Sequence, residues 1–146
     1  MQLSTRDFGT VEVNDSDIIE FTQPMFGFDE YRKYVMLCDE EIGSQFAWLQ
    51  SADDPELCFL LADPDLAKPG YRDVIPQKTL SELGKGAAFE CWVVMVVPEE
   101  NFSDATVNLK SPVLINTQTR QAAQIILEQD YPIRCPLNRK DANPSC

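Results

Sequence analysis

Residues 88–97 read Ala-Phe-Glu-Cys-Trp-Val-Val-Met-Val-Val, and this stretch decides the class of fold. It is apolar at nearly every position and rich in β-branched and aromatic residues, which favours a strand. A strand that is apolar on both faces needs cover on both sides. We therefore predict a central strand here, which ends at Pro98 because proline cannot donate to a sheet.

Most other apolar segments are also short and are bounded by Gly, Pro, Asp or Asn, which is the pattern of strands and turns. One helix of a turn or two is predicted at residues 79–83, with Thr79 as its N-cap and Gly84 as its stop. Polar turns predict three hairpins, around Gly9, between residues 50 and 57, and between residues 115 and 122. The further predicted strands are residues 3–8, 10–13, 18–21, 34–38, 46–50, 57–62, 71–75, 106–109, 113–115 and 122–127.

About ten short strands with tight turns are hard to leave as one open sheet, because long unpaired edges promote aggregation. The sequence thus predicts a mainly β, single-domain protein with an antiparallel β-barrel-like or folded-sheet architecture and at most one or two short helices. The expected domain covers residues 1–137. After Leu127 the chain is rich in proline, so we predict no regular structure there and an irregular tail at 138–146.

The net charge of −12 is confined to one part of the chain. Residues 1–65 hold 15 acidic and three basic residues, whereas residues 66–146 hold nine of each. An acidic surface repels phosphate backbones, so direct binding of nucleic acid is not expected. It favours a basic protein partner, although charge of this kind can also serve only solubility.

Few residues in the chain are suited to catalysis. There is no histidine, and no phosphate-binding loop or nucleophile-elbow pattern occurs. Adjacent carboxylates at Glu40-Glu41, Asp53-Asp54 and Glu99-Glu100 leave a carboxylate-based hydrolase or a metal-binding enzyme domain as the alternative. Neighbours on a strand point to opposite faces, however, and in turns they usually face water. We therefore expect a protein that is not an enzyme.

The cysteines and the N-terminus indicate a reducing compartment. Five cysteines at irregular spacing include no Cys-x-x-Cys pair, so neither a disulfide framework nor a zinc site is predicted. Cys38, Cys58 and Cys91 lie in apolar runs and are predicted to be buried free thiols. The N-terminus lacks the pattern of a signal peptide, and the apolar run at 91–97 is too short to span a membrane. A cytoplasmic protein with no cofactor and no membrane partner is expected.

Three separated blocks of the chain are Thr106-Val107-Asn108-Leu109-Lys110-Ser111-Pro112-Val113-Leu114-Ile115-Asn116 followed by Gln124-Ile125-Ile126-Leu127; Phe21 followed by Gly27-Phe28 and Tyr34; and Leu49-Gln50-Ser51 through Asp54-Pro55-Glu56 to Phe59 and Asp63-Pro64. In their residues, order and spacing these blocks resemble the FliW family of flagellar assembly factors over residues 1 to about 137. The chain departs from the usual pattern at residues 23–28, where one glycine is missing and a proline has moved, and at Ser111, where alanine is usual.

The resemblance implies a regulator that binds the RNA-binding translational repressor CsrA and, alternatively, flagellin. It would thereby couple the flagellin level to flagellin translation and act as a flagellin chaperone, and we expect a monomer when it is free. The polar residues of the 106–116 block either face a partner or pin a turn. The candidate partner-binding residues are Asp53, Asp54, Glu56 and Asp63 of the acidic half, and Thr106, Asn108, Lys110 and Asn116 of the matched block.

The absence of histidine and of paired cysteines gives the first testable prediction. The purified protein should carry less than one equivalent of any metal, because it lacks the nitrogen and sulfur ligand sets of structural sites. Its melting temperature should be the same with and without a reductant. Elemental analysis and thermal unfolding measure the two quantities. One bound equivalent of zinc, or a large fall in melting temperature on reduction, would contradict the prediction.

Overall fold

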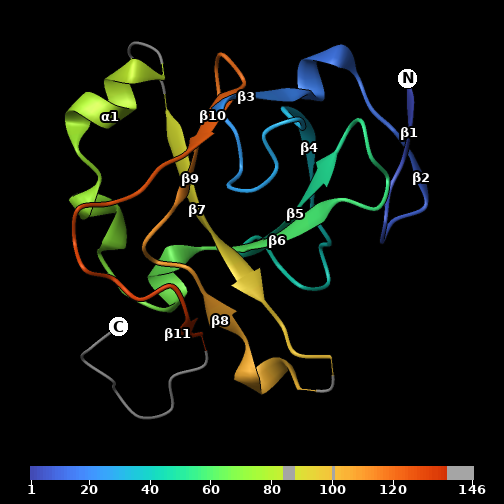
Figure 1. The fold of residues 1–146 in the computed structure, drawn as a ribbon. Helices are drawn as coiled ribbons and strands as arrows, with labels where there is room; N and C mark the ends of the chain where they lie inside the picture. Colours follow the sequence, from blue (N-terminus) through green and yellow to red (C-terminus); the bar gives the residue numbers. More distant parts are fainter. Residues whose placement is uncertain (84–87, 100, 138–146) are drawn as a thin grey trace.

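Seven strands close into a barrel in the computed structural model, which describes residues 1–83, 88–99 and 101–137 (Figure 1). Their order around the barrel is β7-β6-β5-β4-β3-β10-β9, and a pairing between β9 and β7 closes it. This confirms the predicted mainly β, barrel-like fold. The barrel strands are β3 (Ile19–Gln23), β4 (Lys33–Leu37), β5 (Phe46–Ser51), β6 (Cys58–Ala62), β7 (Phe89–Val96), β9 (Val113–Asn116) and β10 (Gln121–Gln124).

Strand β7 is the central strand that the sequence predicts. It pairs with β6, with β9 and with β8 (Thr106–Val107). Trp92 and Val94 contribute to the core inside the barrel. The alternating residues Cys91, Val93 and Met95 pack into a second core outside it. Both faces are covered, which explains why the strand is apolar throughout.

Every neighbouring pair in the barrel is antiparallel except β3 and β10, which run parallel. The sequence pattern gives no sign of this parallel pair. Strand directions cannot alternate all the way around a ring of seven strands, so such a ring needs at least one parallel contact. The register also shifts between Ala122 and Ala123, as at a β-bulge.

The barrel interior is filled by apolar side chains from all seven strands. Phe21 and Tyr34 meet edge to face, with ring centroids 5.1 Å apart. Burying a large apolar side chain contributes roughly 1.5–3 kcal/mol, so this packing is a major source of stability. The fully buried members of the cluster include Ile19, Phe21, Tyr34, Leu49, Leu61, Val113, Ile115 and Ala122.

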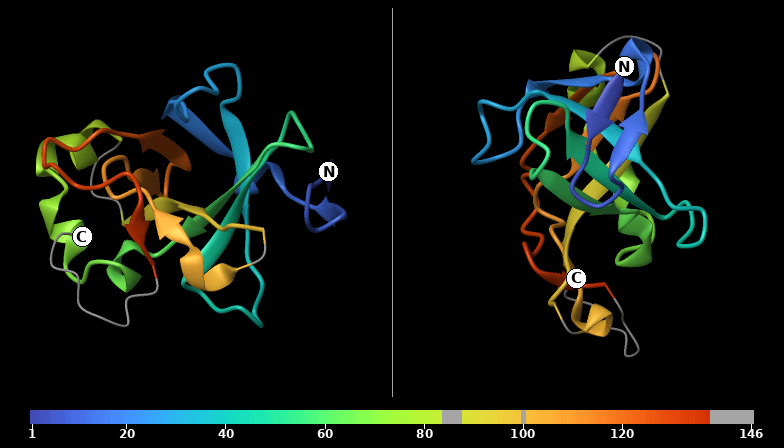
Figure 2. Two further views of the ribbon diagram at one scale, coloured as in Figure 1. Left: turned by 60° about the horizontal axis from the view of Figure 1, so that its bottom comes forward. Right: turned by 90° about the vertical axis from the view of Figure 1, so that its right-hand side faces the viewer.

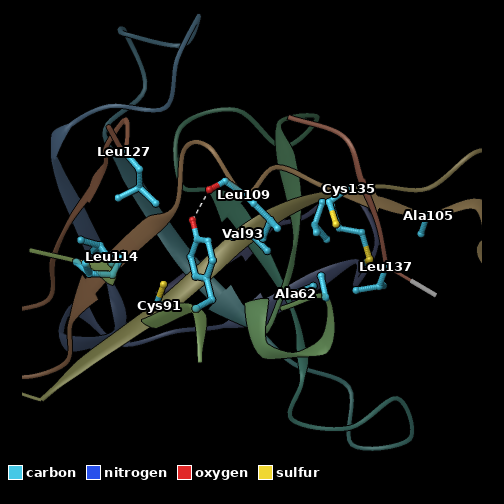
Figure 3. Packing of buried hydrophobic residues seen from close by; sticks show 14 of the residues in the cluster. Ala62, Cys91, Val93, Ala105, Leu109, Leu114, Leu127, Cys135 and Leu137 are labelled. Atoms are coloured by element: carbon cyan, nitrogen blue, oxygen red, sulfur yellow. Dashed lines mark hydrogen bonds between the residues drawn. The ribbon is translucent and has the colours of Figure 1, made fainter. Parts of the chain in front are cut away.

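The second core lies on the outer side of the barrel, over β6, β7, β9 and β10 (Figure 3). Short helices and the C-terminal segment cover this side (Figures 1 and 2). Tyr71 is fully buried there, and its hydroxyl donates a hydrogen bond to the carbonyl oxygen of Leu109. The covering helices are η2 (Pro64–Leu66), η3 (Tyr71–Val74) and α1 (Gln77–Glu82).

A separate hairpin of β1 (Gln2–Ser4) and β2 (Thr10–Glu12) packs on the outer side of β4. Leu3 and Val13 contact Val35 in a small third core. The turn contains Gly9 at φ +64°, a conformation that side chains with a Cβ adopt reluctantly. This hairpin matches the one predicted around Gly9.

Two predictions for the covering segments were wrong in type or in bounds. Residues 71–74 form the 3₁₀ helix η3 in place of the strand predicted at 71–75, since Gly70 turns the chain at φ +80° and the backbones of Asp73 and Ile75 donate hydrogen bonds three residues back, to the carbonyls of Gly70 and Arg72. Helix α1 starts two residues before the predicted N-cap Thr79, after Pro76. The predicted stop at Gly84 lies outside the described residues.

The C-terminal part and one cysteine also differ from the prediction. Strand β10 ends at Gln124 instead of residue 127, and a short strand β11 (Cys135–Pro136) pairs with β8 in the segment expected to be irregular. The expected tail at 138–146 lies outside the described residues.

Cys38 is exposed because β4 ends one residue before it, whereas Cys58 and Cys91 are buried as predicted. Burial raises the pKa of the Cys91 thiol to about 12.

Two buried tyrosines test the hydrogen bond in the second core: Tyr71, which makes it, and Tyr34 of the barrel interior as the control. Tyr71→Phe should lower the free energy of unfolding by about 1–3 kcal/mol, because it leaves the buried Leu109 carbonyl without its donor. Among the described residues no hydrogen-bond partner lies within reach of the buried Tyr34 hydroxyl. Tyr34→Phe should therefore be neutral or slightly stabilising. Urea unfolding measures both, and equal losses would contradict the assignment.

Candidate functional site

The turn between β5 and β6 carries three acidic residues, Asp53, Asp54 and Glu56, which we call the acidic loop. It projects from the end of the β5–β6 hairpin (Figure 1). Asp53 and Glu56 are exposed, and Asp54 is half-buried. Asp54 Oδ1 accepts a hydrogen bond of 3.0 Å from the Glu56 backbone, so this carboxylate shapes the turn. The two carboxylates that face solvent are therefore Asp53 and Glu56.

A buried glutamine holds the acidic loop from below. Gln50 is 0% exposed, and its Nε2 lies 3.1–3.3 Å from the carbonyl oxygens of Ser51, Asp54, Pro55 and Leu57. Its Oε1 accepts a hydrogen bond of 2.9 Å from the backbone of Arg6. The loop is thus fixed to the barrel and to the β1–β2 hairpin, which presents its carboxylates in a defined position.

The acidic loop borders a wider surface of mixed charge. Asp53 lines a shallow hollow of about 590 Å³ together with Asp15 and Glu20. Lys33 and Arg120 line the same hollow. Acidic residues from three separate segments are therefore brought together, and two bases partly offset them.

Asp63 does not join the acidic loop, because the two lie at opposite ends of β6. That strand has five residues and is by itself roughly 16 Å long at about 3.3 Å per residue. Asp63 caps η2 by accepting a hydrogen bond of 3.0 Å from the Asp65 backbone. Its Oδ1 also lies 3.6 Å from the Arg72 guanidinium. These contacts give Asp63 a local structural role.

In the matched block 106–116, the two asparagine side chains fix turns beside strands β8 and β9. Thr106 is half-buried in β8. Asn108 Oδ1 accepts hydrogen bonds from the backbones of Lys110 and Ser111, at 3.0 and 3.2 Å. The Lys110 ammonium donates to the Gln129 carbonyl at 2.7 Å. Asn108 therefore forms an Asx turn, as its residue type favours.

Asn116 lies at the other end of β9 and is 0% exposed. Its Nδ2 donates to the Leu83 carbonyl at 2.9 Å, which ties β9 to the end of α1. Its Oδ1 accepts from the backbones of Gln118 and Thr119, at 2.9 and 3.1 Å. We therefore assign Asn116 a structural role in this turn and not a direct contact with a partner.

The buried Gln124 has a structural role that the sequence pattern does not reveal. Its side chain accepts a hydrogen bond of 2.8 Å from the Phe26 backbone and donates one to the carbonyl oxygen of Ser111. Gln124 thus joins the two places, residues 23–28 and Ser111, where the chain differs from the usual family pattern.

An apolar groove of about 400 Å³ opens on the outer side of β5, β6 and β7. The alternation of Phe46 and Trp48 on one face of β5 was the available signal for it.

Within residues 1–83, 88–99 and 101–137, no three His, Cys, Asp or Glu side chains are grouped so that they could hold a metal ion. In the same part of the chain, no helix is long and apolar enough to cross a membrane.

The fold and the surface define the class of protein: a small closed β-barrel with an acidic loop and an apolar groove on its outside. The family model described as FliW protein matches residues 2–137. A flagellar assembly factor FliW of Caldanaerobacter subterraneus subsp. tengcongensis is 36% identical over 94% of this chain and 93% of its own length. One of Moorella thermoacetica is 38% identical over 88% and 82%.

A solved structure agrees with these matches. The crystal structure of a flagellar assembly factor FliW superimposes with a TM-score of 0.82 at 30% identity, covering 97% of this chain and 100% of that one. The chain belongs to the FliW family of flagellar assembly factors, as its three sequence blocks predict.

The role of Gln50 in the acidic loop gives a testable prediction. Gln50→Leu should lower the free energy of unfolding by about 1–3 kcal/mol, because it leaves buried polar groups without partners. The backbone amides of residues 53–57 should also exchange hydrogen faster. Gln45→Leu, at an exposed position, is the control and should change stability by less than about 0.5 kcal/mol. Equal stability of the two variants would refute the role of Gln50.

Proposed function

We propose that this flagellar assembly factor works by binding two proteins in turn, flagellin and the translational repressor CsrA. When flagellin is abundant it occupies the protein. After flagellin is exported, the free protein binds CsrA and relieves the repression of flagellin synthesis. The observation that carries this proposal is the match of residues 2–137 to the FliW family. On this reading the protein acts in the cytoplasm, is a monomer when free and needs no cofactor.

The charge distribution supports a basic partner such as CsrA. The net charge of −12 falls within residues 1–65, and the exposed Asp53 and Glu56 lie at the tip of a rigid hairpin there. An acidic surface attracts a basic protein such as CsrA and repels the RNA that CsrA would otherwise bind. Antagonism of CsrA can therefore arise without occupying the RNA site itself.

The enzyme alternative receives less support from the geometry of the adjacent carboxylates. Hydrolysis of a glycosidic bond needs two carboxyl groups that face the same scissile bond. In the pair Asp53-Asp54, one side chain faces solvent and the other is hydrogen-bonded within its own turn. Binding through the surface is the function that this arrangement favours.

The proposal predicts a specific effect of reversing the exposed charges of the acidic loop. The double variant Asp53→Lys/Glu56→Lys keeps Asp54, which shapes the turn, and should leave the free energy of unfolding within about 0.5 kcal/mol. Its association rate with CsrA should fall at least about tenfold at low salt, and rising salt should reduce the difference. Surface plasmon resonance at two ionic strengths measures both effects.

The matched control changes the net charge by the same amount at another place. Glu128→Lys/Asp130→Lys alters two exposed acids that lie near the C-terminus, outside the acidic half. Its association rate should stay within about twofold of the unmodified protein. If both double variants slow association equally, net charge and not the acidic loop is responsible. If the unmodified protein binds neither CsrA nor flagellin, the proposed function is refuted.

A further inference from the structure

The apolar groove on the outer side of β5, β6 and β7, which we call the outer groove, is built by three cross-strand neighbours. Trp48, Leu60 and Met95 lie side by side in the strand register and form its floor. Its walls are Ile42, from the loop after β4, and Phe102, the first residue of the 3₁₀ helix η4 (Phe102–Asp104); they are 50% and 55% exposed. Large apolar side chains that gather around a hollow are typical of binding sites, whereas single exposed ones are not.

The surroundings of the outer groove carry negative charge. Arg6 and Asp7 lie at one end and pair with each other, at 2.8 Å between Nη2 and Oδ2. The Arg6 guanidinium also donates to the Cys58 carbonyl at 2.9 Å, so its charge is already engaged. Exposed acids stand next to the two wall residues along the described chain, and none of them lines the groove itself: Glu41 comes directly before Ile42, and Glu99 and Asp104 lie on either side of Phe102.

The strand pairing determines how a partner could enter this groove. Strands β5, β6 and β7 are each hydrogen-bonded to neighbours on both sides, so the floor offers no free edge for an added strand. Contact must therefore be made through side chains. Three strands at about 4.8 Å spacing are roughly 10 Å across, close to the diameter of about 10–12 Å of an α-helix.

We propose that the outer groove binds an amphipathic helix of a partner protein, with basic residues beside its apolar face. Apolar side chains at positions i, i+3, i+4 and i+7 would pack on Trp48, Leu60 and Met95. Lysine and arginine side chains next to this stripe would pair with the exposed acids that adjoin Ile42 and Phe102 in the chain. This inference rests on the proposed function in that it assumes a protein partner, and it adds the site and the chemistry of the segment bound.

A designed peptide tests the inference without any assumption about which partner is natural. The probe is an 18-residue helix of leucine and lysine with leucine at the stated spacing and no tryptophan. Trp92→Phe leaves Trp48 as the single tryptophan of the chain, so its emission reports on the groove. Titration should give a saturable blue shift, and a peptide with glutamate in place of lysine should bind at least tenfold more weakly.

Two matched double variants show whether the binding is in the groove. Ile42→Ser/Phe102→Ser, made in the Trp92→Phe protein, should weaken binding at least tenfold. Ile126→Ser/Ile133→Ser removes two isoleucines that are 64% and 63% exposed and do not line the groove, and its affinity should stay within twofold. Each fold should be checked by circular dichroism. Equal affinities of the two double variants, or no saturable shift, would overturn the inference.

Other occupants of the groove would give different results. If the small apolar dye ANS binds there and the peptide does not displace it, the groove is a small-molecule site and the inference fails. If the protein forms dimers that Ile42→Ser/Phe102→Ser abolishes, and the peptide does not compete, a second copy is the occupant and the inference fails. Failure of the peptide while CsrA and flagellin still bind would refute only the groove. Groove-dependent peptide binding without binding of either protein would refute only the proposed function.

Discussion

The pairing of β7 with β9 is the constraint on which the rest of the structure depends. It joins Phe89–Trp92 to Val113–Asn116 and closes seven strands into a barrel, so that no edge is left within the ring. Closure with an odd number of strands requires a parallel contact, which falls at β3 and β10. It also leaves β7 covered on both faces, by the barrel interior and by the outer core.

Cover on the outside of the barrel is uneven, and this unevenness creates the surfaces available for binding. The helices η2, η3 and α1 and the C-terminal segment cover one side, where Tyr71 is bonded to Leu109. The β1–β2 hairpin covers β4. Between these two covers, Trp48 and Leu60 are only half-buried and line the outer groove together with the buried Met95 of β7. The acidic loop lies at the end of the same β5–β6 hairpin, so an apolar and a charged surface share one rigid support.

The candidate site was predictable only in part. An acidic tip on a hairpin follows from Asp-Asp-Pro-Glu between two apolar runs, and the structure places Asp53 and Glu56 there in solvent. The same reasoning could not separate Asp54 and Asp63, whose carboxylates accept backbone hydrogen bonds, from free acids. Asn116 was indistinguishable from a surface residue, because the backbone groups that bury it come from its own turn and from Leu83, far away in the chain.

The sequence by itself determined most of the strands and turns, the position of the charge and the family, because these depend on residue periodicity and order along the chain. It also indicated that residues 88–97 need cover on both faces. Tertiary structure alone decided which strands pair, which pair is parallel, and where the outer groove lies. It also decided that residues 71–74 form a 3₁₀ helix where the sequence predicts a strand. These features depend on contacts between residues distant in the chain, such as Trp48 with Leu60 and Met95, and local patterns carry no information about which distant segments will pack together.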